Sequence, residues 1–119
     1  MYRNHLRWRK ENNVDTILTD FDFTEREAFL GVYPQGYYKT DKSGRPITIQ
    51  HLGTIDLKRI KEVTSMDRML KFHIQEYERF LKCITPICSR VYGKHIDTTF
   101  AILDVKGARC CAQWFCVQN

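Results

Sequence analysis

One long amphipathic segment dominates the sequence and limits what the chain can fold into. Between Ser65 and Gly93, apolar side chains recur every three or four residues, which places them along one face of a helix. Pro86 lies inside this pattern without the N–H that a helix interior needs, so we expect a kink or break at or one turn before it. Gly93 is a typical helix end. The apolar stripe consists of Met66, Leu70, His73, Ile74, Tyr77, Leu81, Ile84, Cys88 and Val91.

A β-hairpin pattern precedes this helix. Tyr37–Thr40 and Ile47–Gln50 read as strands, and the joining sequence DKSGR contains the turn residue Gly44. Strict alternation then divides the first strand between two faces, with Tyr37 and Lys39 on one and Tyr38 and Thr40 on the other.

An apolar strand pattern follows the helix. In HIDTTFAILDVKG the apolar run from Phe100 to Val105 is nearly unbroken, which predicts a strand buried on both faces of a mixed or parallel sheet. Hairpin, long helix and buried strand together predict an α/β unit, in which the last strand returns to the sheet through a helical crossover.

Shorter helices are predicted from capping signals. The start of the chain, including NHLRWRK, reads as helical. Thr24 followed by Glu27 has the spacing of a capping box and predicts a helix over 25–31. DLKRIKEV predicts a helical turn, and Thr64 with Asp67 gives a second capping pair before the long helix.

The composition is typical of one globular domain, with 43% hydrophobic and 13% aromatic residues in 119. The start MYRNHLRWRKENN has no apolar run after it, so we expect no secretory signal. No apolar run reaches the length of a membrane span either. We therefore expect a cytoplasmic protein.

The cysteines are expected to be free thiols in a reducing compartment. The terminal sequence CCAQWFC lacks the paired spacing of a zinc site, so we expect no metal and no other cofactor. The five cysteines are Cys83, Cys88, Cys110, Cys111 and Cys116.

Charged residues give no catalytic pattern. Asp20 and Asp22 form a carboxylate pair, but no His or Lys partner stands at a fixed spacing, so we interpret them as solvated acids and expect no enzyme. His73 is interpreted as a core or boundary residue. The net charge is +5, and the basic residues of the first helix are spaced to share one face, which is either solvated or contacts an acidic partner. These residues are Arg3, Arg7, Arg9 and Lys10.

Short motifs run in order through residues 8 to 107: WRK with DTIL, YPQ with KTDKSGRP, LG before the long helix, VTS with RML and EYE, CSR, and LDVKG. In this order they resemble the CRAL-TRIO lipid-binding proteins, and most closely the secretory-pathway phosphatidylinositol/phosphatidylcholine transfer proteins. The resemblance implies an incomplete CRAL-TRIO fold of class α/β, with N-terminal helices, a β-hairpin, a long kinked helix and one buried strand.

The resemblance also divides the chain. Residues 1–31 would be a remnant of the family's N-terminal helical region, residues 32–107 the N-terminal half of its lipid-binding domain, and residues 108–119 an unmatched tail. We expect this tail to be poorly ordered or loosely packed, because it carries little element signal.

In that family the hairpin and the following strand form part of the floor of an apolar cavity that holds one phospholipid. The resemblance implies that Tyr37, Tyr77 and Thr99 line this cavity. Strand alternation predicts that Thr48 and Ala101 face it as well. An apolar wall with a few hydroxyls suits the ester and phosphate oxygens of a phospholipid, and no group needs to break a bond.

The implied function is phospholipid binding and transfer of the phosphatidylinositol/phosphatidylcholine type, with transient membrane contact and no nucleic-acid partner. The implied location is cytoplasmic, peripheral to Golgi and endosomal membranes. The family's inositol-phosphate contacts match no residue of this chain. We also expect that these 119 residues alone do not transfer lipid and instead self-associate or bind a chaperone, because the strand at 98–104 lacks later strands to pair with.

A second functional class stays open. A small interaction protein could use the basic helix and the exposed sheet to contact an acidic partner or a membrane surface. Phospholipid retained through purification would separate the two classes, because only a lipid-binding module copurifies with it.

Overall fold

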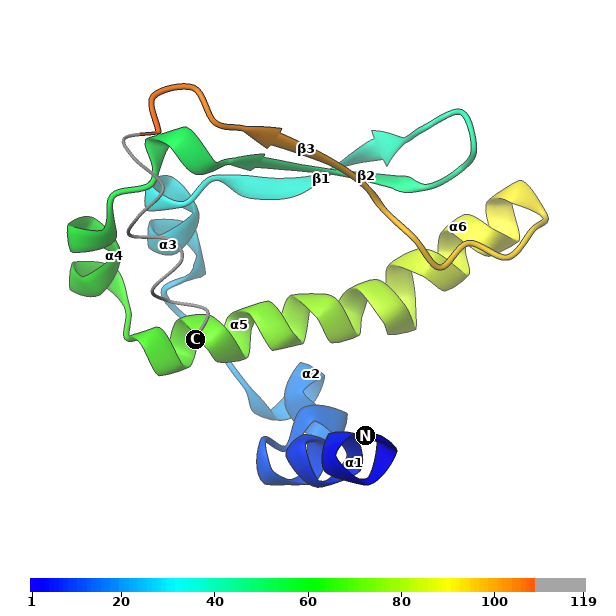
Figure 1. Cartoon of the computed structure of the whole chain (residues 1–119), viewed down its shortest axis with the longest axis horizontal. Helices are drawn as coiled ribbons and strands as arrows, with labels where there is room; N and C mark the ends of the chain where they lie inside the picture. Colours follow the sequence, from blue (N-terminus) through cyan, green and yellow to red (C-terminus); the bar gives the residue numbers. More distant parts are fainter. Residues whose placement is uncertain (109–119) are drawn as a thin grey trace.

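The computed structural model describes residues 1–108, so the expectations for the tail beyond Ala108 lie outside the described residues. None of the helices in these residues is long and apolar enough to cross a membrane. In chain order (Figure 1) the elements are α1 (Tyr2–Glu11), η1 (Val14–Thr16), α2 (Ile17–Asp20), α3 (Arg26–Val32), β1 (Gln35–Thr40), β2 (Pro46–His51), η2 (Leu52–Thr54), α4 (Leu57–Val63), α5 (Met66–Arg79), η3 (Phe80–Ile84), α6 (Thr85–Tyr92) and β3 (Phe100–Asp104).

The three strands form one mixed sheet in the order β1-β2-β3. β1 and β2 are antiparallel, as the hairpin pattern predicts, and β3 joins β2 in parallel after the helical crossover. Figure 1 shows α5 running along one face of this sheet, while no helix among residues 1–108 covers the other face. The predicted α/β class and the crossover are confirmed.

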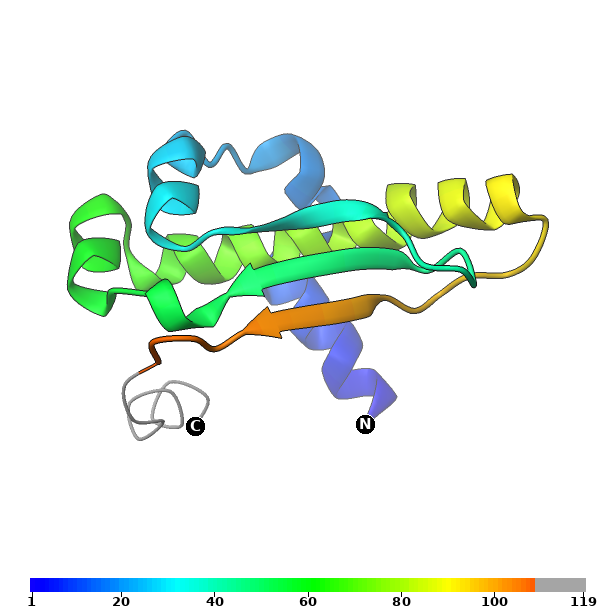
Figure 2. The ribbon, with the colours of Figure 1, turned by 90° about the horizontal axis from the view of Figure 1, so that it is seen from above.

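The predicted burial of β3 is wrong. All five of its residues are exposed, including Phe100 at 45%, Ile102 at 44% and Leu103 at 53%. β3 is an edge strand that pairs only with β2 among the described residues. Figure 2 shows that α5 passes behind β1 and β2 and not behind β3, so α5 does not cover β3.

The long helix forms and changes its winding before Pro86, as predicted. α5 passes into η3, a π-helical segment with wider turns, and then into α6. Pro86 has no N–H to donate to the preceding turn. The hydroxyl of Thr85 donates to the Leu81 carbonyl at 3.3 Å, so a side chain satisfies one carbonyl of that turn. α6 ends at Gly93, which adopts φ +65°.

Both predicted capping boxes are wrong, because α3 begins after Glu25 and α5 begins after Ser65. Thr24 lies outside α3, and the carboxylate of Glu25 accepts from Arg68 Nε and Thr64 Oγ1, both at 2.7 Å. Since Thr64 is engaged by Glu25, Ser65 caps α5 instead, accepting from the backbone N–H of Arg68 at 3.3 Å.

An aromatic core holds α3, α4 and α5 together. Phe29 and Phe72 are fully buried, and their rings meet edge to face at 5.5 Å between centroids. His73 borders this cluster at 6.0 Å from the ring of Tyr33, and burial lowers its pKa. The interpretation of His73 as a core or boundary residue therefore fits its position. The buried residues of this core are Phe23, Phe29, Tyr33, Ile60 and Phe72.

The predicted alternation along β1 is also wrong. Lys39 adopts φ +53°, and the pairing shifts between Tyr37 and Thr40, so β1 contains one extra residue. The shift returns Thr40 to the face that Tyr37 occupies. Accordingly, Thr40 Oγ1 lies 2.6 Å from the hydroxyl of Tyr92 on α6.

Gly53 allows the end of β3 to dock on the sheet. A Cβ on Gly53 would lie 2.0 Å from the carbonyl oxygen of Lys106, closer than any side chain tolerates. We therefore expect Gly53→Ala to lower the free energy of unfolding by about 2 kcal/mol, because η2 and the segment after β3 would be forced apart.

The matched control is Gly31→Ala in α3, where no atom lies within 4 Å of the added Cβ. Alanine favours a helix, so this variant should be more stable than wild type by roughly 0.5–1 kcal/mol. Urea denaturation followed by circular dichroism measures both changes. Similar effects of the two substitutions would contradict the close approach at Gly53.

Candidate functional site

Three of the five predicted site residues lie in one row across the sheet. Tyr37 of β1 pairs with Thr48 of β2, and Thr48 pairs with Ala101 of β3. Directly paired residues on neighbouring strands project to the same face of a sheet. The fold therefore brings residues from distant parts of the sequence onto a common surface.

This row lies on the face of the sheet that α5 follows, which we call the helix-side face. The ring of Tyr37 stacks on that of Phe80 in η3, with 6.4 Å between centroids and 4° between planes. Gln50, two residues after Thr48 on the same face, accepts from the Tyr33 hydroxyl at 3.3 Å. Both contacts fix the orientation of the face.

Tyr77 joins the row through Phe80. The two rings stack at 6.1 Å between centroids, so Phe80 neighbours both Tyr37 and Tyr77. Phe80 is 6% exposed, whereas Tyr77 is 62% exposed and open to a ligand. The sequence interpretation missed Phe80, although its position three residues after Tyr77 on the predicted helix is a signal for such a contact.

Thr99 lies just before β3, two residues from Ala101. Its hydroxyl donates to the carbonyl of Pro46 at 2.8 Å, so its proton is already engaged. The oxygen keeps acceptor capacity. Thr99 therefore adds a side-chain hydrogen bond at the point where β2 and β3 begin to pair.

The Tyr37 hydroxyl of the site is neutral. Burial raises the pKa of Tyr37, and the nearby charge of Glu76 raises it further. Its phenol therefore stays protonated at neutral pH and serves as both donor and acceptor. Around it the helix-side face offers Ala101 and the half-exposed Leu103, which are apolar. The surface combines apolar area with a few uncharged hydroxyls.

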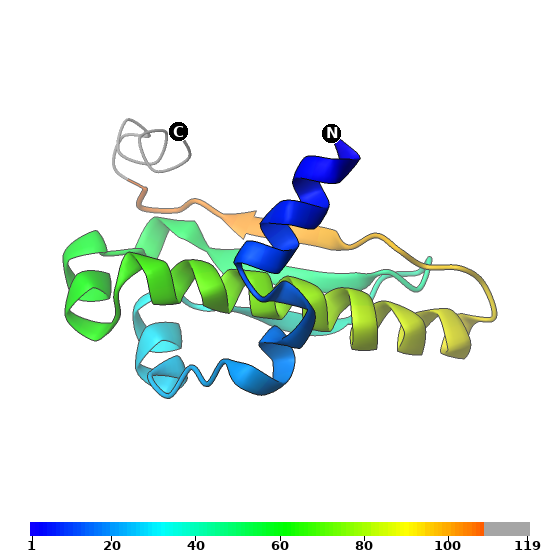
Figure 3. The ribbon, with the colours of Figure 1, turned by 90° about the horizontal axis from the view of Figure 1, so that it is seen from below.

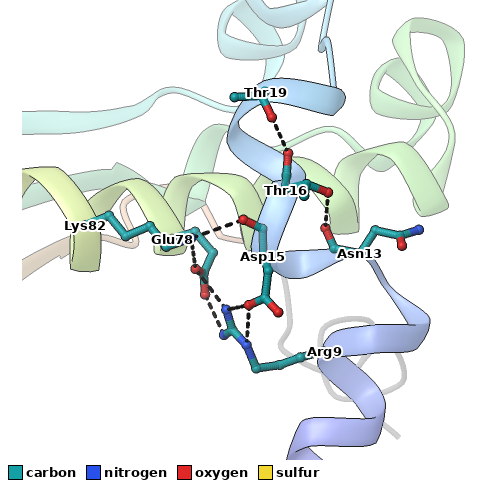
Figure 4. A network of polar contacts seen from close by, with 7 residues as sticks. All are labelled: Arg9, Asn13, Asp15, Thr16, Thr19, Glu78 and Lys82. Carbon is teal, nitrogen blue, oxygen red and sulfur yellow. Dashed lines mark hydrogen bonds and ion pairs between the residues drawn. The ribbon is translucent and has the colours of Figure 1, made fainter.

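An ion network anchors α1 beside this site (Figure 4). Arg9 Nη1 donates to Glu78 Oε1 at 2.8 Å, and Arg9 Nε donates to Asp15 Oδ1 at 3.0 Å. Lys82 adds an ion pair to Glu78 at 3.2 Å. The Glu78 side chain is only 5% exposed, and hydrogen bonding from Arg9 lowers its pKa despite burial. Figure 3 shows α1, in dark blue, crossing the middle of α5.

This network corrects the predicted basic face of the first helix. Arg9 turns toward Glu78 and Asp15 instead of sharing a solvated face, because a buried carboxylate requires a compensating charge. The remaining basic residues of α1, Arg3, Arg7 and Lys10, are exposed.

The described residues contain no cluster of side chains suited to a metal ion. No group of three His, Cys, Asp or Glu side chains in them could hold a metal ion. Cys83 is an exposed free thiol and Cys88 a buried one, while the three later cysteines lie beyond the described segment. A surface cavity of about 290 Å³ contains none of the five site residues; it is lined by Ser43, Arg45, Lys94, His95, Ile96 and Thr98.

The chain is similar to phosphatidylinositol/phosphatidylcholine transfer proteins over 107 residues, 90% of its length. Transfer proteins SFH13 and SFH12 of Arabidopsis thaliana are 48% and 45% identical to it, and SEC14 cytosolic factor of Kluyveromyces lactis is 45% identical. The chain spans 17%, 20% and 36% of the lengths of these relatives, respectively. No family model matches the chain. The predicted resemblance to these transfer proteins is confirmed.

The Arg9–Glu78 network predicts acid sensitivity. The pKa of Glu78 is lowered in the folded state, so its contribution is complete above the unfolded value of 4.5 and is lost as pH falls below it. Glu78→Gln should lower the free energy of unfolding at pH 7 by roughly 2 kcal/mol. It should also flatten the decline of stability below pH 4.5.

Glu27→Gln provides the control, because Glu27 is an exposed residue of α3. Denaturant unfolding at a series of pH values from neutral to acidic measures both variants. An acid limb of Glu78→Gln as steep as that of wild type would show that the network does not contribute to folding.

The stacked position of Phe80 predicts a large cost for its removal. Phe80→Ala should destabilise the fold by about 3 kcal/mol, because it leaves a cavity where a buried ring stacked with two tyrosines. Phe80→Leu keeps most of the apolar volume and should cost only about 1 kcal/mol. Thermal denaturation gives the stabilities, and near-ultraviolet circular dichroism reports the tyrosine environment. Equal costs for the two variants would rule out a contribution specific to ring stacking.

Proposed function

We propose that the protein binds a phospholipid against the helix-side face of its sheet, with Tyr37, Thr48, Tyr77, Thr99 and Ala101 lining the site. The observation that carries the proposal is the row Tyr37–Thr48–Ala101, which is in register across three strands and connected to Tyr77 through Phe80. The relatives are named for phosphatidylinositol and phosphatidylcholine transfer, which supports the same ligand class.

The chemistry of the face suits this ligand. Acyl chains gain from contact with apolar side chains, at about 25 cal/mol per Å² of apolar area removed from water. The neutral hydroxyls of Tyr37 and Thr48 can bond to ester or phosphate oxygens without introducing an unpaired charge. Because the five residues include no acid, base or activated nucleophile, the site is proposed to bind and not to catalyse.

The wider assignments follow from the relatives. Transfer of phosphatidylinositol and phosphatidylcholine between membranes, transient membrane contact and action at Golgi or endosomal membranes from the cytoplasm are proposed for the protein. These 119 residues alone are still expected not to transfer lipid. Residues 32–107 are proposed to provide this part of the lipid-binding domain, and residues 1–31 to belong to the helical region before it. The Arg9–Glu78 ion pair supports a fixed arrangement of the two parts.

A second function is favoured by α1. This helix has no buried residue, and its exposed surface combines Arg3, Arg7 and Lys10 with Tyr2 and Trp8. An acidic partner or an anionic membrane surface would complement it. In this alternative the protein is an interaction module that carries no lipid.

Copurified lipid tests the proposed site. The purified 119-residue chain should retain phospholipid, identified by native mass spectrometry and solvent extraction. Tyr77→Asp should abolish retention, because a carboxylate in an apolar lipid contact costs several kcal/mol if unpaired. Vesicle-to-vesicle transfer, measured on the same sample, tells binding apart from transport.

Tyr2→Asp on α1 is the matched control, since Tyr2 is exposed and distant in sequence from the five residues. It should leave lipid retention unchanged. Retention by Tyr77→Asp at the wild-type level would exclude the site. If wild type binds anionic vesicles but carries no lipid, the interaction module is the correct function.

A further inference from the structure

The surface cavity of about 290 Å³ has its own chemistry, separate from the five proposed lipid contacts. One wall is the turn between β1 and β2, and the other is the segment that joins α6 to β3 (Figure 2). Both walls lie before β3 in the sequence and within the described residues. The turn contributes Ser43 and Arg45, and the segment contributes Lys94, His95, Ile96 and Thr98.

The lining of the cavity consists mainly of hydrogen-bond donors. Arg45 and Lys94 are cations at neutral pH, and the other polar residues offer two hydroxyls and one imidazole. The lining contains no carboxylate, and its one apolar residue, Ile96, is 4% exposed. Donors and positive charge without an acid favour an anionic ligand.

The carboxylate of Asp41 holds the first wall in place. Its Oδ1 accepts from the backbone N–H of Ser43 at 2.8 Å and from that of Arg45 at 2.9 Å, and its Oδ2 accepts from Arg45 Nε at 2.7 Å. Asp41 therefore spends its charge inside the turn and orients the Arg45 side chain. The terminal nitrogens of Arg45 donate to no side chain or carbonyl of the described residues.

Ser89 of α6 holds the second wall. Its hydroxyl oxygen accepts from the backbone N–H of Ile96 at 2.8 Å, and its carbonyl accepts from the backbone N–H of Lys94 at 3.2 Å. The backbone of this segment is thus fixed, whereas the ammonium of Lys94 is exposed and pairs with no acid of the described residues.

The two walls are packed against each other. A Cβ on Gly44 would lie 2.5 Å from the ring of Tyr92 and 2.8 Å from Cδ1 of Ile96, so the turn lies close against α6 and the second wall. The Thr99 hydroxyl adds its bond to the Pro46 carbonyl across the same junction. Because the cavity is already formed, a ligand pays little for ordering it.

A second acid lies nearby without entering the cavity. The carboxylate of Asp97 is 3.5 Å from Nε2 of His95 and is 68% exposed, and Asp97 is not among the lining residues. It pairs with His95 and leaves the charges of Arg45 and Lys94 for a ligand.

We propose that this cavity binds a phosphomonoester, with Arg45 and Lys94 contacting its oxygens from the two walls and the Ser43 hydroxyl donating a further bond. At neutral pH a phosphomonoester has a charge of about −1.5 to −2 and three acceptor oxygens, which matches separate donors around one cavity. A carboxylate has one charge and two oxygens, and it would leave donors without a partner.

The volume of the cavity limits the size of the ligand. Sites for drug-sized molecules measure roughly 300–1,000 Å³, so a cavity of about 290 Å³ suits the phosphate and a small part of the group that carries it. This group belongs either to a soluble phosphoester or to a lipid headgroup at a membrane surface. The phosphomonoester is the chemistry that both sources share.

Nuclear magnetic resonance of the 119-residue chain tests the site with inorganic phosphate. Titration at constant ionic strength should give saturable amide shifts confined to residues 42–46 and 94–99. Lys94→Gln should weaken binding about tenfold, a change of roughly 1.4 kcal/mol. Ser43→Asp should abolish binding, because it places a negative charge among the lining residues. Both positions are exposed, so both variants should fold.

Lys42→Gln is the matched control. It removes the same charge from the same turn, but Lys42 is exposed and is not part of the lining. Its affinity for phosphate should stay within about twofold of wild type, because an exposed charge contributes little. Absence of saturable shifts, shifts spread beyond the two walls, or equal weakening by Lys94→Gln and Lys42→Gln would each overturn the proposal.

Vesicle binding identifies the source of the phosphomonoester. Phosphatidylcholine vesicles with added phosphatidic acid present a phosphomonoester, whereas vesicles with added phosphatidylglycerol present an anionic phosphodiester. A lipid source predicts a preference for phosphatidic acid that Lys94→Gln removes. A soluble source predicts equal binding to both vesicles, unchanged in Lys94→Gln, together with binding of inorganic phosphate.

The site is independent of the proposed lipid cavity. Lys94→Gln should retain copurified phospholipid as wild type does, because the phosphate cavity contains none of the five lipid contacts. The basic surface of α1 would attract both kinds of anionic vesicle, so only the preference for phosphatidic acid is assigned to the cavity. A preference that persists unchanged in Lys94→Gln and in Ser43→Asp would overturn the assignment.

Discussion

The parallel pairing of β3 with β2 determines which residues of this protein share one face of the sheet. The hairpin pairs Tyr37 with Thr48, and only the parallel pairing adds Ala101, which is far from both in the sequence, to the same row. A parallel pair requires a crossover, and α4, α5, η3 and α6 provide it. The crossover also carries Tyr77 and Phe80 past the face that the row occupies. One topological constraint therefore produces both the surface and the helix beside it.

The wide turns of η3 precede Pro86 and affect how the rest of the helix meets the sheet. Pro86 cannot donate a backbone hydrogen bond to the preceding turn of the helix. The helix does not end there but adopts π-type winding over Phe80–Ile84. This winding begins at Phe80, the residue whose ring contacts Tyr37 and Tyr77. Continuous α-winding would rotate the residues after Phe80 relative to the sheet. Pro86 thus contributes to where α6 meets the sheet, including the contact between Tyr92 and Thr40.

Patterns within a single helix or strand were predictable from the sequence. Contacts that a side chain makes with other elements of the fold were not. The spacing of apolar residues indicated α5 and the hairpin because periodicity depends on each segment alone. Thr24 was a plausible cap in isolation, but Glu25 is engaged by Arg68 and Thr64 from across the fold. The positive φ of Lys39 could not be predicted from its identity, because lysine does not favour that conformation. The apolar run of β3 indicates side chains that favour burial. Whether a neighbouring element buries them depends on the topology of the fold, and in the described residues none does. The row of site residues was accessible only through the family resemblance and strand alternation.

Pairing within the sheet and contact with a ligand make different demands on β3, and the geometry of a strand lets it meet both. Side chains project above and below a sheet, whereas N–H and C=O groups lie in its plane. β3 pairs with β2 through its backbone. The side chains of Ala101 and Leu103 therefore stay available to a lipid on the helix-side face, as the proposed site requires.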